Sequence, residues 1–159
     1  MAVPDHQDVG NGQRAFWMLL FYMLIGPVLG GLAGAALFTG GAIFGVAPGP
    51  FYGKPFADVA PNIVPIGIMA LVWSVIPSAF TAVGLFPTVL KSGTVGFLMA
   101  AAVGVIAFTA AILIFPFPTG GVQPLIAFIA GCIAVACRAL LLRGGIIKQE
   151  VETPDSDRH

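Results

Sequence analysis

Four long apolar runs dominate the sequence and constrain what it can fold into. They extend over Ala15–Phe38, Asn62–Phe86, Ser92–Phe115 and Pro124–Leu142. The hydrocarbon core of a bilayer is about 30 Å thick, and a helix needs about 20 apolar residues to cross it. All four runs are close to this length or longer. The sequence therefore predicts an all-α, polytopic membrane protein with four transmembrane helices in one bundle.

The charged residues support this prediction by their placement. Only 9% of the residues are charged, whereas an ordinary soluble domain has about a quarter. Arg138 is the only basic residue inside a run, and all acidic residues lie outside the runs: Asp5, Asp8, Asp58, Glu150, Glu152, Asp155 and Asp157. A soluble fold would need helices buried on every side in a core larger than this chain can enclose.

The predicted organisation is one membrane domain with two polar ends. The domain covers residues 15–142, between an N-terminal segment at 1–14 and a tail at 143–159 whose mixed charges predict disorder. The first run has 24 residues, more than the roughly 7 to 15 of a signal-peptide core, so we expect it to be retained.

The basic residues predict the orientation. With four spans, the termini share one side of the membrane with Arg14, Lys91, Arg138, Arg143, Lys148 and Arg158, whereas Lys54 alone lies on the other side. Because basic residues concentrate in cytoplasmic flanks, both termini are predicted to be cytoplasmic. Arg138 is close enough to that side for its long side chain to reach the headgroups.

Small residues recur at every fourth position in two of the runs. The first run has Gly26, Gly30 and Gly34, and the third has Gly96, Ala100 and Gly104. In lipid, small residues in this register let two helix backbones approach closely. We therefore expect the first and third spans to pack together or to form the seam of an oligomer.

The second span combines a proline with a polar stripe. Ser74, Ser78 and Thr81 share one helix face around Pro77, and Pro27 lies inside the first span. We expect both prolines to kink their helices. The hydroxyls are interpreted as partners for carbonyls freed by Pro77 or for a neighbouring helix. The alternative is that they line a path for a small polar solute.

The segment WSVIPSAFTAVG around Pro77 resembles the Gly-x-x-Pro-Ala-x-x-Thr-Gly helix of small four-span bacterial inner-membrane proteins of unknown function. The resemblance covers about a dozen residues. Val75 falls near the first small residue of that pattern, and Ala82 replaces its last glycine. The resemblance implies a bacterial inner-membrane location and implies no activity.

The outer loop at residues 40–61 is rich in proline, glycine and aromatic residues. Phe51, Tyr52 and Phe56 suit the headgroup region, where aromatic rings gather. Lys54 and Asp58 are either paired or face water. The loop is interpreted as an interfacial hairpin. Together with the segment PFPTGG at 116–121, it is expected to form a cap on the outer side of the bundle. The alternative is the entrance of a transport path or a docking surface.

Residues for catalysis or cofactor binding are missing from the runs. The two histidines, His6 and His159, lie near the ends of the chain, and no acidic residue lies in a span. We therefore expect no metal, no cofactor and no proton relay. Cys132 and Cys137 are expected to be inert packing residues. The zero net charge, without a basic cluster, gives no indication of nucleic-acid binding.

Together these observations predict a non-enzymatic integral membrane protein. Its expected surroundings are the lipid bilayer and either further copies of itself or a larger membrane complex, in which it would be a packing or accessory component. One alternative is a small passive channel or transporter for a neutral or weakly polar solute, with a path formed by Ser74, Ser78, Thr81, Lys54 and Asp58. A further alternative is a lipid-binding protein that uses the outer aromatic loop.

Overall fold

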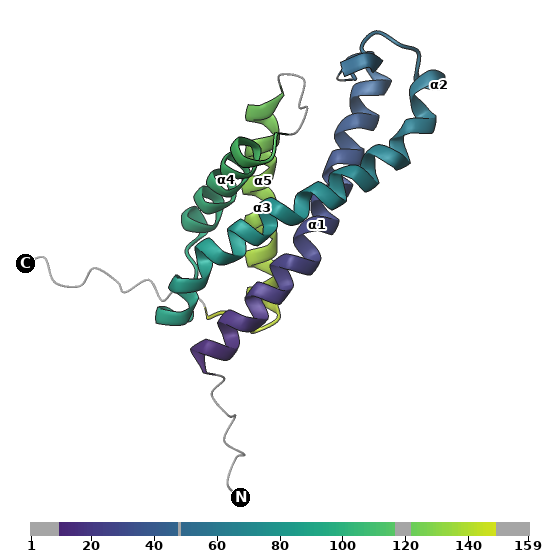
Figure 1. Cartoon of the computed structure of the whole chain (residues 1–159). Coiled ribbons are helices and arrows are strands. Elements are labelled where there is room, and N and C mark those ends of the chain that lie inside the picture. The colour runs from purple at the N-terminus through teal and green to yellow at the C-terminus, as the bar shows by residue number, and fades with distance from the viewer. Residues whose placement is uncertain (1–9, 48, 117–121, 149–159) are drawn as a thin grey trace, which may run out of the picture.

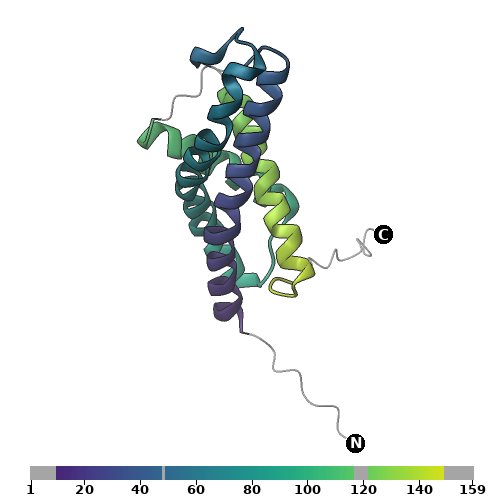
Figure 2. The same ribbon diagram turned by 90° about the vertical axis from the view of Figure 1, so that its right-hand side faces the viewer.

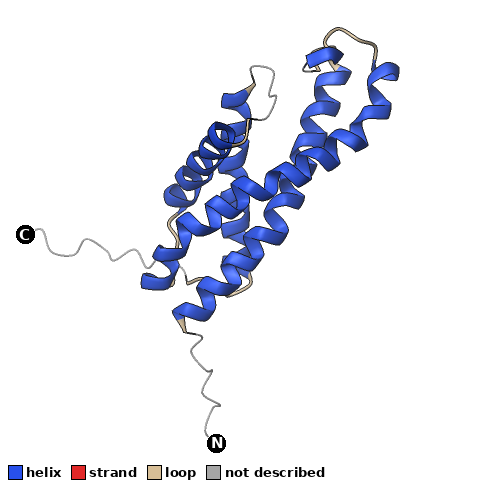
Figure 3. Cartoon of the chain, in the orientation of Figure 1, coloured by secondary structure: helices blue, strands red, loops and turns tan. Residues whose placement is uncertain are grey.

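The computed structural model of the chain describes residues 10–47, 49–116 and 122–148. Within these residues the chain is helical apart from turns and one isolated β-bridge between Thr94 and Lys148 (Figure 3). The long helices are α1 (Asn11–Ile43), α3 (Ile63–Ser92), α4 (Phe97–Ile114) and α5 (Gln123–Arg143). Short helices η1 (Gly49–Phe51), α2 (Phe56–Val59) and η2 (Ala60–Asn62) join α1 to α3.

Among the described residues, four helical segments are long and apolar enough to cross a membrane. They are α1, α3 together with α2 and η2, α4 and α5. The predicted all-α membrane protein with four transmembrane helices is thereby confirmed.

The four long helices form two antiparallel hairpins, α1 with α3 and α4 with α5 (Figures 1 and 2). The hairpins touch where α3 contacts α4 and where α1 contacts α5. We call the end where α1 begins and α5 ends the basal end, and the opposite end, which carries η1 and α2, the distal end. Figure 1 shows the hairpins close together toward the basal end and diverging toward the distal end.

Burial along α3 reflects this divergence. Its buried residues all lie between Pro77 and Val89, in the basal half of the helix. The distal half, from Ile63 to Ile76, has no buried residue. The distal half of the α1–α3 hairpin is therefore an arm formed mainly by two helices, which we call the distal arm. Near its inner end, the Trp73 ring packs edge-to-face on Phe108 of α4.

Two helix boundaries differ from the ends of the predicted runs. The second run ends at Phe86, whereas α3 continues through Pro87 to Ser92. The third run begins at Ser92, whereas α4 starts at Phe97. Gly93 ends α3 in the left-handed conformation, with φ of 70°, a conformation that glycine adopts at little cost and that commonly terminates helices.

The main apolar core joins the two hairpins in the basal half. Tyr22, Leu85, Ala100 and Leu141 come from the four long helices and are almost fully buried in it. A smaller cluster at the distal end consists of Phe38, Ala42, Ala47 and Val59. The main core holds the two hairpins together, and the smaller cluster stabilises the connection between α1 and α3.

Candidate functional site

The glycine face of α1 packs against α3. A Cβ atom built on Gly26 would collide with the Ser78 side chain, and one on Gly30 would collide with the Ser74 side chain. On Gly34 it would lie 2.6 Å from the Ala70 Cβ. These contacts correct the expected pairing of the first and third spans, because the glycine face of α1 is occupied by the second span.

A second row of residues in the α1–α3 contact also approaches closely. A Cβ on Gly31 would lie 2.7 Å from the Leu71 Cβ and 3.2 Å from the Gly67 carbonyl oxygen, and one on Gly67 would lie 3.2 Å from the Ala35 Cβ. Glycines on both helices therefore allow this contact. The matching of small residues between α1 and α3 determines their antiparallel register.

The small residues of the third span pack on α5. A Cβ on Gly104 would lie 2.7 Å from the Ala134 Cβ and 3.0 Å from the Ala130 carbonyl oxygen, and Ala100 is fully buried. Gly96 precedes α4 as its N-cap residue, in an extended conformation. Gly96 is therefore not part of a helical packing face, contrary to the expectation, because the helix starts later than the apolar run.

The polar stripe of α3 lies in the contact with α1. Ser78 and Thr81 are buried, and Ser74 and Ser78 fill the space left by the α1 glycines. The Ser74 hydroxyl donates to the Ala70 carbonyl oxygen, and the Thr81 hydroxyl donates to the Pro77 carbonyl oxygen at 2.7 Å. Such bonds within the helix satisfy the hydroxyls without water. This geometry agrees with the helix-contact interpretation.

The two charged residues of the outer loop lie apart from that stripe. Lys54 and Asp58 are both exposed at the distal end, and the Lys54 Nζ lies 5.8 Å from the centre of the Phe51 ring. Phe51 itself packs edge-to-face on Phe38, with ring centres 5.3 Å apart. Within the described part of the chain, Lys54 and Asp58 form no ion pair. The structure does not bring them together with the stripe of α3.

Two arginines at the basal end have partners that sequence reasoning missed. Arg14 is 8% exposed, and its Nη1 donates to the carbonyl oxygens of Gly145 and Ile146 at 3.2 and 3.0 Å. The Arg138 Nε donates to the Val95 carbonyl oxygen in the loop between α3 and α4. Both guanidinium groups therefore hold loops of the bundle. Acceptors on the main chain leave no pattern in a sequence.

A buried tyrosine also joins the hairpins. The Tyr22 hydroxyl, on α1, donates to the Ala134 carbonyl oxygen on α5 at 2.8 Å. A buried phenol needs such a partner, and the main-chain acceptor beside small α5 residues provides it. This contact fixes the α1–α5 packing at mid-helix.

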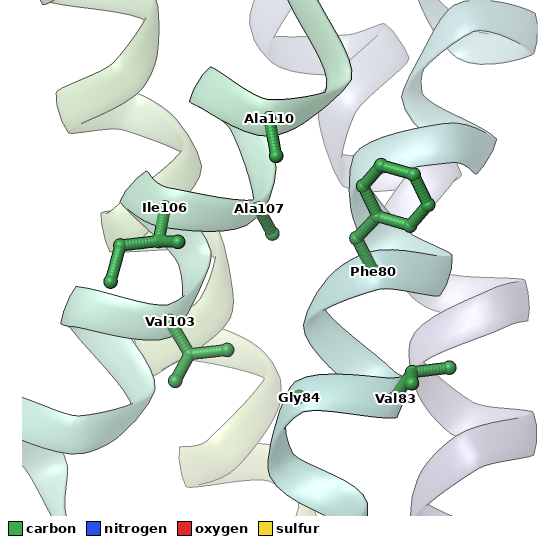
Figure 4. A pocket seen from close by; sticks show the side chains of 7 residues that line it. All are labelled: Phe80, Val83, Gly84, Val103, Ile106, Ala107 and Ala110. Carbon is green, nitrogen blue, oxygen red and sulfur yellow. The ribbon is translucent and has the colours of Figure 1, made fainter. Parts of the chain in front are cut away.

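An apolar groove separates α3 from α4 and has a volume of about 390 Å³ (Figure 4). Its lining residues are Phe80, Val83, Gly84, Val103, Ile106, Ala107 and Ala110. A second groove, of about 250 Å³, lies between α4 and α5 toward the distal end and includes Thr109 and Gln123. The lining of neither groove includes the stripe of Ser74, Ser78 and Thr81.

The side chains that commonly bind metals are dispersed over the part of the chain that the structure describes. Their His, Cys, Asp and Glu side chains form no group of three that could hold a metal ion. Cys132 is exposed and Cys137 is buried, and both are free thiols. The arrangement supplies helix contacts, apolar grooves and hydrogen bonds to the main chain.

Comparison with protein-family models, with curated proteins and with solved structures finds no match to this chain.

Proposed function

We propose that the protein is a non-enzymatic packing or accessory component of a membrane assembly. The observation that carries this proposal is the distal arm, in which α3 has no buried residue between Ile63 and Ile76. On this arm Val64, Ile68 and Val72 are 68%, 58% and 63% exposed. Within the bundle this half of α3 contacts α1, and its Trp73 ring packs edge-to-face on Phe108 of α4 with ring centres 5.5 Å apart. The remaining apolar surface, which includes Val64, Ile68 and Val72, is available to another transmembrane protein.

The glycine faces pack against helices of the same chain, and this limits the surfaces on which a partner protein can bind. Because Gly26 and Gly30 are covered by α3, and Gly104 by α5, these faces are not available to a second protein. The partner surface that we propose consists of branched and long apolar side chains on the distal arm. Helix association in lipid through such side chains depends on close van der Waals packing.

The passive-channel alternative has less support. It required the hydroxyl stripe of α3 to face a water-filled path, but Ser74 and Ser78 lie against Gly30 and Gly26 of α1. The α3–α4 groove has an apolar lining. A polar solute would find few hydrogen-bond partners along either surface.

The proposed location is the bacterial inner membrane with both termini in the cytoplasm. The resemblance of the segment around Pro77 to small four-span bacterial inner-membrane proteins supports this location. The distribution of basic residues supports the orientation. Lys91, Arg138 and Arg143 lie toward the basal end, whereas Lys54 and Asp58 lie at the distal end. Under the positive-inside rule the basal end faces the cytoplasm.

Photo-crosslinking in living cells tests the assembly role. A photoreactive phenylalanine analogue at Val72, on the distal arm, is expected to give an adduct with a protein partner, which mass spectrometry would identify. The same analogue at Phe128 is the control, because this α5 residue is similarly exposed, at 67%, but lies on the other hairpin. Adducts with lipid alone at both positions would contradict the proposal.

A further inference from the structure

The α3–α4 groove has a floor of small residues and walls of large ones. Gly84, Ala107 and Ala110 are the small lining residues, and Phe80 and Ile106 flank them (Figure 4). At Gly84 the helices approach closely, since a Cβ there would lie 2.9 Å from the Val103 Cγ1. The volume of about 390 Å³ lies in the range of pockets that bind small organic ligands, about 300 to 1,000 Å³. In Figure 4 the α5 ribbon lies behind α4 and the α1 ribbon lies behind α3. Two lining residues, Val83 and Ile106, are 63% and 65% exposed, so the groove opens on the outer surface of the bundle.

The face of α3 that lines the groove also carries a basic residue, Lys91, nearer the basal end. Phe80 and Gly84 are followed on the same helix face by Thr88 and Lys91, at the spacings of four, four and three residues that keep side chains on one face. Thr88 bridges to α4 below the groove, with its Oγ1 3.7 Å from the Met99 Sδ. Lys91 lies in the last turn of α3 and is exposed. Its ammonium group forms no ion pair with the described residues.

The distance along α3 from Lys91 to the groove is close to the thickness of one leaflet of the hydrocarbon core. Lys91 is seven residues from Gly84 and eleven from Phe80, which corresponds to roughly 10 to 17 Å along a helix. Half of the hydrocarbon core is about 15 Å thick. A lipid whose phosphate is at the level of Lys91 therefore has the ends of its acyl chains at the level of the groove.

We propose that the α3–α4 groove binds one acyl chain of an anionic glycerophospholipid from the surrounding leaflet, with its phosphate held by Lys91. The apolar lining excludes a polar ligand, and the positive charge at one leaflet's depth selects a negatively charged headgroup over a neutral one. This site does not depend on the distal arm or on a protein partner. It would make the lipid a structural element between the two hairpins.

Competition between two lipids tests the site. The full chain, purified in detergent, would receive equal amounts of phosphatidylglycerol and phosphatidylcholine with identical acyl chains, and native mass spectrometry would count the retained lipids. We expect one phosphatidylglycerol to be retained in preference. Lys91→Gln should reduce this preference about fivefold, as expected for one basic residue near the membrane surface.

Matched variants separate the cation from the groove. Arg143→Gln removes an exposed charge at the same end of the bundle and should leave the preference unchanged. Ala110→Phe fills the groove and should reduce retention of both lipids. Ala102→Phe places the same ring on an exposed part of α4 outside the groove and should have no effect. Circular dichroism and the thermal midpoint would establish that each variant is folded.

Three results would overturn the proposal. The first is equal retention of the two lipids by the native chain, and the second is an unchanged preference in folded Lys91→Gln. The third is a dimer that folded Ala110→Phe abolishes while lipid retention is unchanged, because the groove would then bind a second copy of the chain.

Discussion

At Gly30, the absence of a side chain determines how closely two helices approach. The place that a Cβ would take is occupied by the Ser74 side chain, and the Ser74 hydroxyl turns back to its own helix at the Ala70 carbonyl oxygen. The serine thus acts as a small packing residue with an internally satisfied hydroxyl. Lipid tails are as apolar as the helix surface, so this close contact is an important source of association energy.

Replacing Gly30 with a large residue should therefore destabilise the bundle. Gly30→Leu is expected to lower the free energy of unfolding by about 1 to 3 kcal/mol, a typical cost of overpacking. The matched control is Gly40→Leu on the same helix, because a Cβ at Gly40 meets no atom within 4 Å. Thermal unfolding in detergent measures both, and Ser78→Ala should cost less than Gly30→Leu. Equal, small effects of the two leucine variants would contradict the prediction.

The second residue-scale prediction concerns Arg138. Its hydrogen bond satisfies the carbonyl of Val95, a residue that is 2% exposed. Arg138→Met keeps a long side chain but removes the donor, and the unpaired acceptor should cost about 1 to 3 kcal/mol of unfolding free energy. Arg143→Met should cost little, because Arg143 is exposed. Chemical denaturation compares the two variants, and a similar stability for both would exclude a structural role for the Arg138 contact.

At the scale of elements, the sequence predicted the helices well and their partners poorly. The glycines at positions 26, 30 and 34 indicated a close contact, and the structure provides it, but with α3 in place of the third span. A signal for the correct partner was present, since Ala70, Ser74 and Ser78 form a matching ridge of small residues at every fourth position. Spacing identifies a ridge that can pack closely, but many ridges fit one another in a bundle of small residues.

The antiparallel register of α1 and α3 can be tested by a crosslink. In a background of Cys132→Ala and Cys137→Ala, the pair Ala35→Cys and Gly67→Cys should form a disulfide on mild oxidation, because a Cβ at Gly67 lies 3.2 Å from the Ala35 Cβ. The control pair combines Ala35→Cys with Met69→Cys, on a more exposed face of α3. A mobility shift in non-reducing electrophoresis reports the bond. Equal crosslinking of the two pairs would show that the register is different.

At the scale of the whole molecule, the two hairpins are tied together toward the basal end. Tyr22 joins α1 to α5, Arg14 joins α1 to the turn after α5, and Arg138 joins α5 to the loop between α3 and α4. The sequence predicted the number of spans, because composition and length determine it. It did not predict these connections, since their acceptors are main-chain carbonyl oxygens that any residue provides.

Tyr22→Phe tests the connection between the hairpins. The change removes only the hydroxyl and leaves the Ala134 carbonyl oxygen without that donor, so the expected loss of unfolding free energy is about 1 kcal/mol. Tyr52→Phe is the matched control, because Tyr52 is 73% exposed. Thermal unfolding in detergent should show a lower midpoint for Tyr22→Phe alone. Identical midpoints for the two variants would show that this hydrogen bond contributes nothing to stability.

The hairpins also differ in length, and this difference acts on the membrane. α1 has 33 residues and α4 has 18, which correspond to about 50 and 27 Å of helix. A bilayer of about 30 Å matches α4, whereas α1 must tilt, extend into water or thicken the lipid around it. Where the lipid around α1 thickens, the protein acts as a one-sided wedge, with relaxed lipid along one flank and stretched lipid along the other. Such a wedge lowers its own energy by moving to thicker regions, so bilayer thickness would sort this protein within the membrane.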